Sequence, residues 1–345
     1  MDMMFVEDCC EILDSMRVPI TAADREEGEY PYYGANGIQD HVADYIFDDE
    51  LVLLAEDGGN FGSKERPIAY RVSGKCWVNN HAHVLKPKAG LDVDYLCYSL
   101  MFYKVDGIVN GATRQKLTQA AMRKMQIPSR SMDKQRHIVD ELNCIIKIKE
   151  QRQNELKLLD DLIKARFIEL FGDPISNTQN RPTTEFINVV KMQRGFDLPV
   201  QDRRQDGEIP VYGSNGALDH HNVAKIQGGG VITGRSGTIG KVFYTEGDYW
   251  PLNTSLFSVD THGNNVIYLA YLLQMFDLTR FVEGTGVPTL NRNMFHNKQI
   301  IDVPIDEQEK FSDFVKQVDK SKVAVRKALN ETQLLFDSLM QQYFG

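Results

Sequence analysis

The sequence of 345 residues is poor in cysteine and has no long apolar run. Its five cysteines show no Cys-x-x-Cys spacing, and Cys9 and Cys10 are adjacent, which argues against a disulfide framework and against a zinc site. No apolar run approaches the length that spans a bilayer, and the acidic start MDMMFVEDCCEILD lacks the basic segment of a signal peptide. We therefore expect a reduced, cytoplasmic protein that binds no metal.

Catalytic motifs are also missing. The chain contains no H-E-x-x-H, no G-x-S-x-G, no P-loop lysine motif and no Asp/Asn-Pro-Pro-aromatic tetrad of the kind found in amino-methyltransferases. The nearest glycine pattern, at residues 234–240, lacks G-x-G-x-x-G spacing and leads into an apolar run typical of a strand. These absences predict a chain that is not an enzyme and holds no cofactor.

The net charge of −9 is unevenly distributed. Residues 1–57 carry 16 Asp and Glu against two Lys and Arg, whereas residues 58–132 carry 12 Lys and Arg against four Asp and Glu. Phosphate binding requires a locally positive surface rather than a positive protein. The acidic total therefore neither excludes nor favours a nucleic-acid partner.

The chain consists of two copies of one unit. The segment GEYPYYGANG at residues 28–37 returns as GEIPVYGSNG at residues 207–216, a shift of 179. Later matches are shifted by 173, among them Leu117 with Leu290 and the Phe-Gly pairs at 171–172 and 344–345. Because chance matches rarely keep one register over a whole chain, we infer a tandem repeat in which each copy takes about half of the sequence.

The first part of each copy has the pattern of an α/β fold. Short apolar runs bounded by Gly, Asp or Asn predict strands at residues 51–54, 76–78, 230–233 and 240–244. Residues 94–103 and 266–276 have helical spacing, so we expect one helix to pack on each sheet.

The second part of each copy is predicted to be a long helix, because apolar residues recur at steps of three and four. The residues expected to pair the helices are Leu142, Ile145, Leu156, Leu159, Ile163, Val318, Val325, Leu329, Phe336 and Leu339. Lys149 and Lys322 interrupt the pattern at matching positions. An unpaired apolar stripe is unfavourable, so we expect the two helices to pair with each other or with a partner helix. The simplest arrangement is an antiparallel pair, with the globular parts at opposite ends.

Together these patterns predict an α+β chain with a pseudo-twofold internal repeat. Two tandem α/β domains would be separated by two long antiparallel coiled-coil helices. The predicted segments are a first α/β domain at 1–130, a central helix at 131–172, a second α/β domain at 173–304 and a C-terminal helix at 305–345.

The repeated Pro-x-Tyr-Gly-x-Asn-Gly element predicts a tight turn whose glycines let the backbone approach a ligand. It is typical either of a hairpin that shapes the sheet or of a loop that meets phosphate. Basic and Gly-rich polar segments downstream favour DNA, because Arg, Lys, Gln and Asn read base edges, although each of these groups could instead be a solvated surface residue. The candidates in the first copy are Tyr33, Gly34, Asn36, Gly37, Lys64, Arg66, Arg71, Lys75, Arg114 and Lys116. The candidates in the second copy are Tyr212, Gly213, Ser214, Asn215, Gly216, Arg235, Ser236, Lys241, Thr289, Asn291 and Arg292.

Two histidines stand where a strand could present them to a metal. His81 and His83 are two residues apart and would share one side of a strand. The second copy has Thr254 and Leu256 at the matching positions, so we expect hydrogen bonding or packing instead.

The sequence resembles the specificity (S) subunits of type I restriction-modification systems over essentially the whole chain. The resemblance lies in the paired elements YPYYGANGIQDHV and IPVYGSNGALDHH, in WVNNHAHVL and PLNTSLFSV, in the helix starts DKQRHIVDELN and VPIDEQEKFSDFV, and in LFGDP after the first helix. It implies that the two α/β domains are target-recognition domains, each reading one half of an asymmetric bipartite DNA site.

The resemblance also implies partners. The helices would set the spacer between the half-sites and dock methyltransferase (M) subunits, two of them in our expectation, and restriction (R) subunits would join through the M complex. S-adenosylmethionine is expected on the M subunits and no cofactor on this chain. The specificity subunit of a type IIB system, and a coiled-coil scaffold that binds protein or glycan, remain the alternatives.

Overall fold

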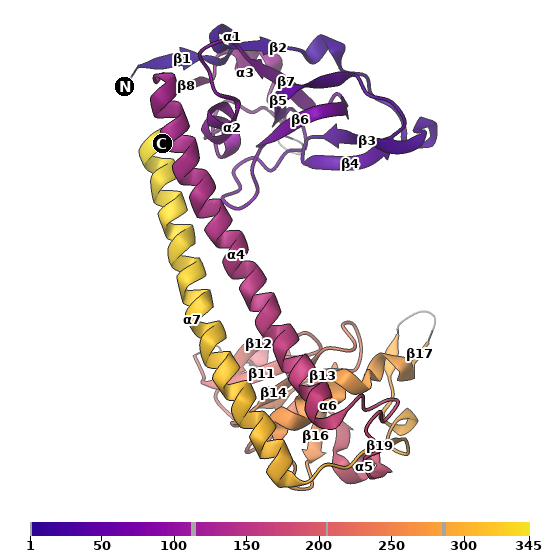
Figure 1. Cartoon of the computed structure of the whole chain (residues 1–345). Helices are drawn as coiled ribbons and strands as arrows, with labels where there is room; N and C mark the ends of the chain where they lie inside the picture. Colours follow the sequence, from indigo (N-terminus) through magenta and orange to yellow (C-terminus); the bar gives the residue numbers. More distant parts are fainter. Residues whose placement is uncertain (1, 112–114, 205, 285–287) are drawn as a thin grey trace. The chain divides into compact units, whose positions relative to one another are not determined.

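The computed structural model describes residues 2–111, 115–204, 206–284 and 288–345, which form two compact units. Unit 1 consists of Met1–Gln151 with Leu329–Gly345, and unit 2 consists of Arg152–Ala328. Each unit contains a globular α/β part and one half of each long helix (Figure 1).

Unit 1 is built on a six-stranded sheet in the order β2-β7-β5-β6-β3-β4. Its strands are β2 (Cys10–Ile12), β3 (Glu27–Gly34), β4 (Gly37–Val42), β5 (Phe47–Ala55), β6 (Ala69–Val78) and β7 (Ala82–Pro87). Neighbours are antiparallel except β3 and β6, which pair in parallel. A second pair, β1 (Met3–Phe5) with β8 (Gln126–Pro128), lies beside α1 (Val6–Cys9).

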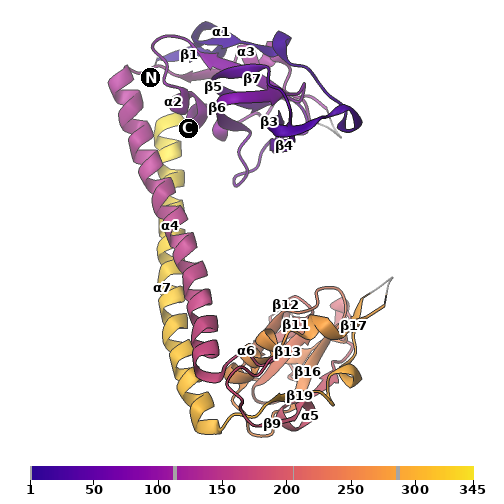
Figure 2. The same ribbon diagram turned by 45° about the vertical axis from the view of Figure 1, so that its right-hand side comes forward.

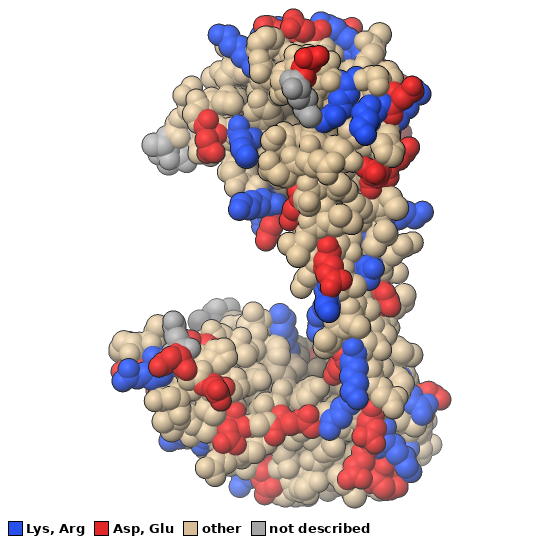
Figure 3. Space-filling model, turned by 90° about the vertical axis from the view of Figure 1, so that its left-hand side faces the viewer, with Lys and Arg blue, Asp and Glu red and all other residues tan. Residues whose placement is uncertain are grey.

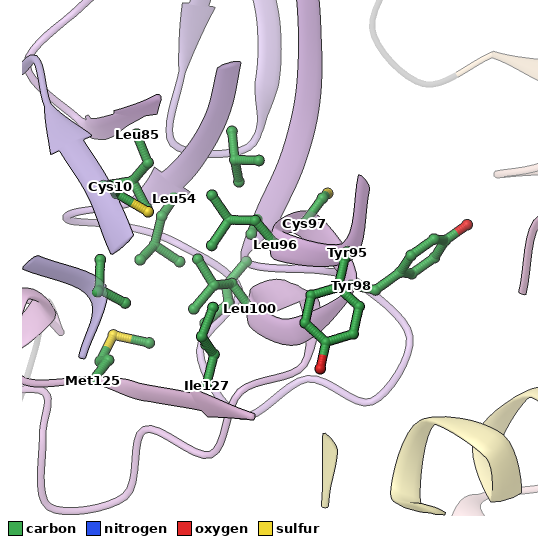
Figure 4. Packing of buried hydrophobic residues seen from close by; sticks show 14 of the residues in the cluster. Cys10, Leu54, Leu85, Tyr95, Leu96, Cys97, Tyr98, Leu100, Met125 and Ile127 are labelled. Atoms are coloured by element: carbon green, nitrogen blue, oxygen red, sulfur yellow. The ribbon is translucent and has the colours of Figure 1, made fainter. Parts of the chain in front are cut away.

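The core of unit 1 lies between the sheet and α2 (Val93–Met101), the helix predicted at 94–103. Leu54 and Leu85 of the sheet and Leu96 and Leu100 of α2 are fully buried, and Figure 4 shows them converging. Each such side chain contributes about 1.5–3 kcal/mol on burial, which holds α2 on the sheet. The short α3 (Gln119–Arg123) precedes β8.

Unit 2 repeats this plan with smaller sheets, ordered β10-β16-β13-β14 and β12-β11-β15, and the pairs β19-β9 and β17-β18. The strands are β9 (Thr183–Glu185), β10 (Lys191–Arg194), β11 (Ile209–Gly213), β12 (Gly216–His221), β13 (Gly230–Gly234), β14 (Val242–Thr245), β15 (Trp250–Pro251), β16 (Ser255–Asp260), β17 (Val282–Glu283), β18 (Thr289–Leu290) and β19 (Gln299–Ile301). The helices are α5 (Phe186–Val189) and α6 (Val266–Phe276), and α6 packs on β13 and β14 as predicted.

Buried glutamines connect each long helix to the short helix of its unit. Gln135 accepts a hydrogen bond of 2.8 Å from the Asp92 amide, and Gln308 accepts one of 2.9 Å from the Asn265 amide. Asp92 and Asn265 are the N-caps of α2 and α6. The two glutamines are 173 residues apart, and so are the two N-cap residues. The repeat found in the sequence is therefore also a repeat of the structure.

The two long helices are α4 (Met132–Phe171) and α7 (Ile305–Phe344), each of 40 residues. In unit 1 the first half of α4 pairs with the second half of α7. The Tyr343 hydroxyl donates to Glu141, and the Lys149 ammonium donates to Gln333. Residue numbers rise along α4 while they fall along α7, so the predicted antiparallel pairing is confirmed in this unit.

In unit 2 the second half of α4 and the first half of α7 are also antiparallel, as Figures 1 and 2 show. Lys322 forms an ion pair of 2.6 Å with Asp160, and the rings of Phe167 and Phe311 meet edge to face at 5.5 Å. Together with the side chains of α6, these aromatic rings form the core of unit 2.

The two lysines that interrupt the heptads have matching roles. Lys149 contacts Gln333, and Lys322 contacts Asp160. The two lysines are 173 residues apart, and so are their partners Asp160 and Gln333. Lys322 is buried. A polar group in an apolar seam fixes the register of paired helices, because a shifted register would leave it without its partner.

The predicted helix-pairing residues are all buried or half-buried. The buried ones are Leu142, Ile145, Ile163, Val318, Val325 and Phe336. The half-buried ones are Leu156, Leu159, Leu329 and Leu339. Within the described parts of the chain, every helix is too short or too polar to cross a membrane.

Candidate nucleic-acid interface

The repeated turn joins two antiparallel strands in each unit. β3 and β4 meet at Gly34 and Gly37, and β11 and β12 meet at Gly213 and Gly216. Gly37 and Gly216 have φ angles of +108° and +104°, which L side chains rarely adopt. Glycine is therefore required at both positions, and the predicted tight turn is confirmed.

Each turn lies against the loop that follows the next sheet strand. In unit 1 the Asn36 side-chain amide donates to the Gly58 carbonyl at 2.9 Å. In unit 2 the Asn215 side-chain carbonyl accepts a hydrogen bond of 2.9 Å from Lys241. Turn and loop therefore form one polar surface in each unit.

Unit 1 has a hollow of about 490 Å³ beside its turn. The predicted residues that line it are Tyr33, Asn36, Gly37 and Arg66. Tyr70 lines it as well, with its ring 5.8 Å from that of Tyr33. Gly34 is buried at the turn, and Lys64 is exposed on the loop that carries Arg66. The structure therefore brings two separate sequence segments of the prediction together.

Arg71 has a structural role that the sequence analysis did not foresee. Its guanidinium forms ion pairs with Glu50 and, at 3.0 Å, with Asp94. These partners place the side chain between β5 and α2, where two carboxylates neutralise it. Arg71 is therefore ion-paired within unit 1 and, like Lys116, stays a predicted contact. Arg71 was chosen because it follows the repeated turn in the sequence. That position does not show which face of β6 packs against α2.

Lys75 and Lys116 are exposed but have partners within unit 1. Lys75 lies 5.7 Å from the Tyr30 ring and 4.5 Å from the Tyr45 ring, and interactions with Tyr30 and then Tyr45 raise the pKa of Lys75. Lys116 pairs with Glu56 at 2.9 Å. Both ammonium groups remain accessible, so both stay predicted contacts.

Unit 2 has a hollow of about 350 Å³. The predicted residues that line it are Arg235, Thr289, Asn291 and Arg292. Arg194, at the end of β10, lines it too. Sequence reasoning missed Arg194, because a single arginine after a short apolar segment has no distinguishing pattern.

The other candidates of unit 2 belong to the turn and the loop that follows β13. Tyr212, Gly213, Ser214 and Gly216 form the turn with Asn215, and Lys241 contacts that asparagine. Ser236 forms an isolated β-bridge with Thr289. One further candidate, Arg114 of the first copy, lies outside the described residues.

A buried polar network lies in unit 1. His83 Nδ1 is 2.7 Å from Asp14, and His83 Nε2 is 2.9 Å from the Leu117 carbonyl oxygen. Arg17 donates to Glu56 at 2.6 Å. The ligand atoms of Asp14, Glu56 and His83 lie within 4.8 Å of one another, as metal ligands would. Arg17 and the two contacts of His83 also link these groups into a hydrogen-bond network within the protein.

The carboxylates of this network are held in the charged state. Burial raises the pKa of Asp14, but hydrogen bonds, first of all from His83, outweigh it and place that pKa below its usual value. Burial likewise raises the pKa of Glu56. Hydrogen bonds, first of all the one from Arg17, outweigh burial and place that pKa below its usual value. His81 lies apart from the network and contacts Asp57 at 2.5 Å.

Charged side chains of both signs are mixed on the outer surface of the units. On the face shown in Figure 3, Lys and Arg side chains lie among Asp and Glu side chains. A nucleic-acid contact therefore depends on local groups, such as those in the two hollows, rather than on the total charge.

Each of the two structural repeats therefore presents one polar surface of turn and loop. The model of the type I restriction modification DNA specificity domain matches the chain twice, over residues 1–158 and 176–332. The chain belongs to this family, and it recognises DNA sequence within a type I restriction-modification system.

Curated relatives and solved structures agree with this assignment. A putative type I restriction enzyme specificity subunit of Haemophilus influenzae is 25% identical over 327 residues, covering 88% of this chain and 84% of that protein. A putative type I specificity subunit of Mycoplasma pneumoniae is 19% identical and covers 89% and 86%.

Two solved structures share the fold. The S subunit of the type I system of M. genitalium has a TM-score of 0.61 at 14% identity, covering 100% of this chain and 96% of that chain. A chain from a study of the assembly and conformational transition of the type I system also has a TM-score of 0.61, at 12% identity, and covers 99% and 97%.

Proposed function

We propose that each α/β part reads one half of an asymmetric bipartite DNA site. The two target-recognition domains would span residues 1–130 and 173–304. The observation that carries this proposal is the duplicated surface of turn and loop, built with the same backbone but different side chains. The repeated asparagine has different neighbours in the two units, because Asn36 contacts the Gly58 backbone carbonyl whereas Asn215 contacts the side chain of Lys241. Different side chains on one scaffold favour different half-sites.

The paired helices would fix the spacer and dock the partner. Their seam residues are largely enclosed within the units, so they serve pairing rather than docking. Exposed apolar side chains on the same helices are better placed to meet an M subunit, notably Leu158 and Leu162 on one face of α4, which are 58% and 48% exposed. The duplication of the chain supports two M subunits, with R subunits joining through them.

Chemistry would belong to the partners. The chain would act as a non-catalytic, cytoplasmic subunit, with S-adenosylmethionine bound by the M subunits. This proposal is supported by family membership and by the absence of a known catalytic motif from the sequence.

DNA binding in rising salt tests this function. The full chain with its M subunits should bind its own target duplex with a steep salt dependence, because phosphate contacts release counterions. Calorimetry with S-adenosylmethionine should give heat with the complex and none with this chain alone. Equal affinity for target and unrelated duplexes would instead support a protein-interaction scaffold.

A further inference from the structure

Three arginines of unit 2 line one hollow without a compensating ion pair. Arg194, Arg235 and Arg292 all line the hollow of about 350 Å³, and none forms an ion pair with another described residue. Glu283 is the one carboxylate among the described lining residues. Three positive charges and one negative charge leave a net charge of +2 around this hollow.

The fold itself does not require these arginines. Leu117 donates its amide to the Glu56 carbonyl at 2.7 Å, and Leu290 donates its amide to the Arg235 carbonyl at 2.8 Å. Glu56 and Arg235 therefore hold the same backbone position in the two units. An acidic side chain at this position in unit 1 is compatible with the same strand and loop.

The other two arginines also replace residues of the buried network. Gln119 stands 173 residues before Arg292 and donates to Asp14 at 2.9 Å. Arg194 lies opposite Leu256 of β16. The residue 173 positions before Leu256 is His83 of β7, and Asp14 contacts His83, so Arg194 takes the place of Asp14. Among the described residues, unit 1 therefore fills this region with groups that hydrogen-bond to one another, whereas unit 2 fills it with cations that form no ion pair with a carboxylate.

Neighbouring cations without counter-charges repel one another and lower stability, unless an anion binds among them. The pKa of His296 lies below its usual value because of burial first, then Arg292 and Lys191. Guanidinium groups pair well with tetrahedral oxyanions, since several N–H groups can donate to one phosphate.

We propose that Arg194, Arg235 and Arg292 together bind one phosphate group of the DNA backbone, and that the described residues of unit 1 form no equivalent site. This inference rests on the proposed function. Because a phosphate contact positions a protein without reading bases, the site would set the register of unit 2 on the duplex. Unit 2 would then supply more of the salt-dependent affinity than the matching region of unit 1.

Ethylation interference tests the inference on the complex of the full chain with its M subunits. Ethylation of one phosphate in the half-site of unit 2 should prevent binding of the wild-type complex. The triple variant R194Q/R235Q/R292Q should no longer distinguish that ethylated duplex from the unmodified one. The slope of log affinity against log salt should become shallower by about 0.9 for one lost phosphate contact.

Lys310→Gln provides the charge control, because Lys310 is exposed on α7 and pairs with Asp306 outside the hollow. It should leave the interference pattern unchanged. An unchanged pattern in the triple variant would overturn the inference. So would a change in guanine methylation interference instead, because the arginines would then read bases.

A second measurement separates this inference from the proposed function. Inorganic phosphate, compared with chloride at equal ionic strength, should slow hydrogen exchange of β18 in the wild-type chain and not in the triple variant. The exchange of β13 and β16 in chloride should match in both, which shows that the variant folds. If the wild type bound no target DNA but phosphate still protected β18, the proposed function would fail and the anion site would stand. Equal hydrogen exchange of wild-type β18 in phosphate and in chloride would overturn the proposed anion site.

Discussion

Glu56 and Arg235 occupy the same position in the two repeats, with side chains of opposite charge. The Glu56 amide donates to the His81 carbonyl at 2.9 Å, and the Arg235 amide donates to the Thr254 carbonyl at 2.8 Å. The backbone is therefore repeated while the surface chemistry is not. A protein that reads two different half-sites requires this combination, because its scaffold must repeat and its contacts must differ.

Acid should weaken unit 1 through its buried carboxylates. The pKa values of Asp14 and Glu56 are lower in the folded chain than the usual values of about 3.9 and 4.3. Their stabilisation is complete above those usual values and is lost as pH falls through the folded values. The free energy of unfolding of unit 1 should therefore decrease below about pH 4.5.

The single tryptophan of each repeat lets this be measured in the full chain. In a Trp250→Phe background, fluorescence of Trp77 should report unfolding of unit 1 in urea across this pH range. Asp14→Asn should reduce the pH dependence of the unfolding midpoint. An identical dependence with and without Asp14 would show that this carboxylate is not responsible.

The ion pair of Lys322 should contribute more to register than to stability. Asp160→Ala should lower the free energy of unfolding of unit 2 by about 1–2 kcal/mol, because the buried ammonium loses a partner. Lys322→Leu should change it by less than about 1 kcal/mol, since Asp160 is half-exposed and can be hydrated. Urea unfolding followed by Trp250 in a Trp77→Phe background measures both.

Lys310→Ala is the matched control for these variants, because its ion pair with Asp306 is exposed and should contribute less than about 0.5 kcal/mol. The double variant of Asp160→Ala with Lys322→Leu should recover most of the stability lost in Asp160→Ala. If Lys322→Leu proved more damaging than Asp160→Ala, the ion pair would be a main source of stability.

Gln308→Leu should destabilise unit 2 by about 2–4 kcal/mol. The side chain is buried, accepts from the Asn265 amide, and donates to the Val303 carbonyl at 2.7 Å. Leucine has similar volume but leaves these two backbone groups without partners, and each such group costs about 1–3 kcal/mol. Trp250 fluorescence in urea again provides the measurement. Gln317→Ala, at an exposed position of α7 in unit 2, should stay within about 0.5 kcal/mol of the wild type.

The repeat made much of the fold predictable. Helical periodicity placed residues 133–171 in one helix, and the structure has it at Met132–Phe171. The matching positions of Lys149 and Lys322 were visible as breaks in the heptads, but their partners Gln333 and Asp160 were not. Such partners come from the other helix, and a pattern along one helix carries no information about them.

The candidate site was less predictable for the same reason. The turn glycines follow from local backbone conformation, so Gly37 and Gly216 were found. The ion pairs of Arg71 could not be predicted, because its partners come from a neighbouring strand and helix. Arg194 and Arg235 are far apart in the sequence and meet only around the hollow of unit 2.

Lengthening one helix should change the spacing between the half-sites and leave the half-sites themselves unchanged. We predict this for insertion of one heptad into α4 between Asn143 and Leu162, because the insertion keeps the apolar seam while adding about 10 Å of helix. Sequencing of methylated sites in cells with the M subunits measures the spacer. Loss of methylation with retained DNA binding would indicate failed M docking, whereas altered half-sites would contradict a role of the helices as a spacer.

Exchange of one recognition domain most directly tests whether each repeat reads its own half of the target. Residues 1–130 would be replaced by the same segment of another family member, and methylated sites would be sequenced in cells that also carry the M subunits. We predict that one half-site changes while the other half-site and the spacer stay the same. A change in both halves, or in neither, would contradict independent reading by the two repeats.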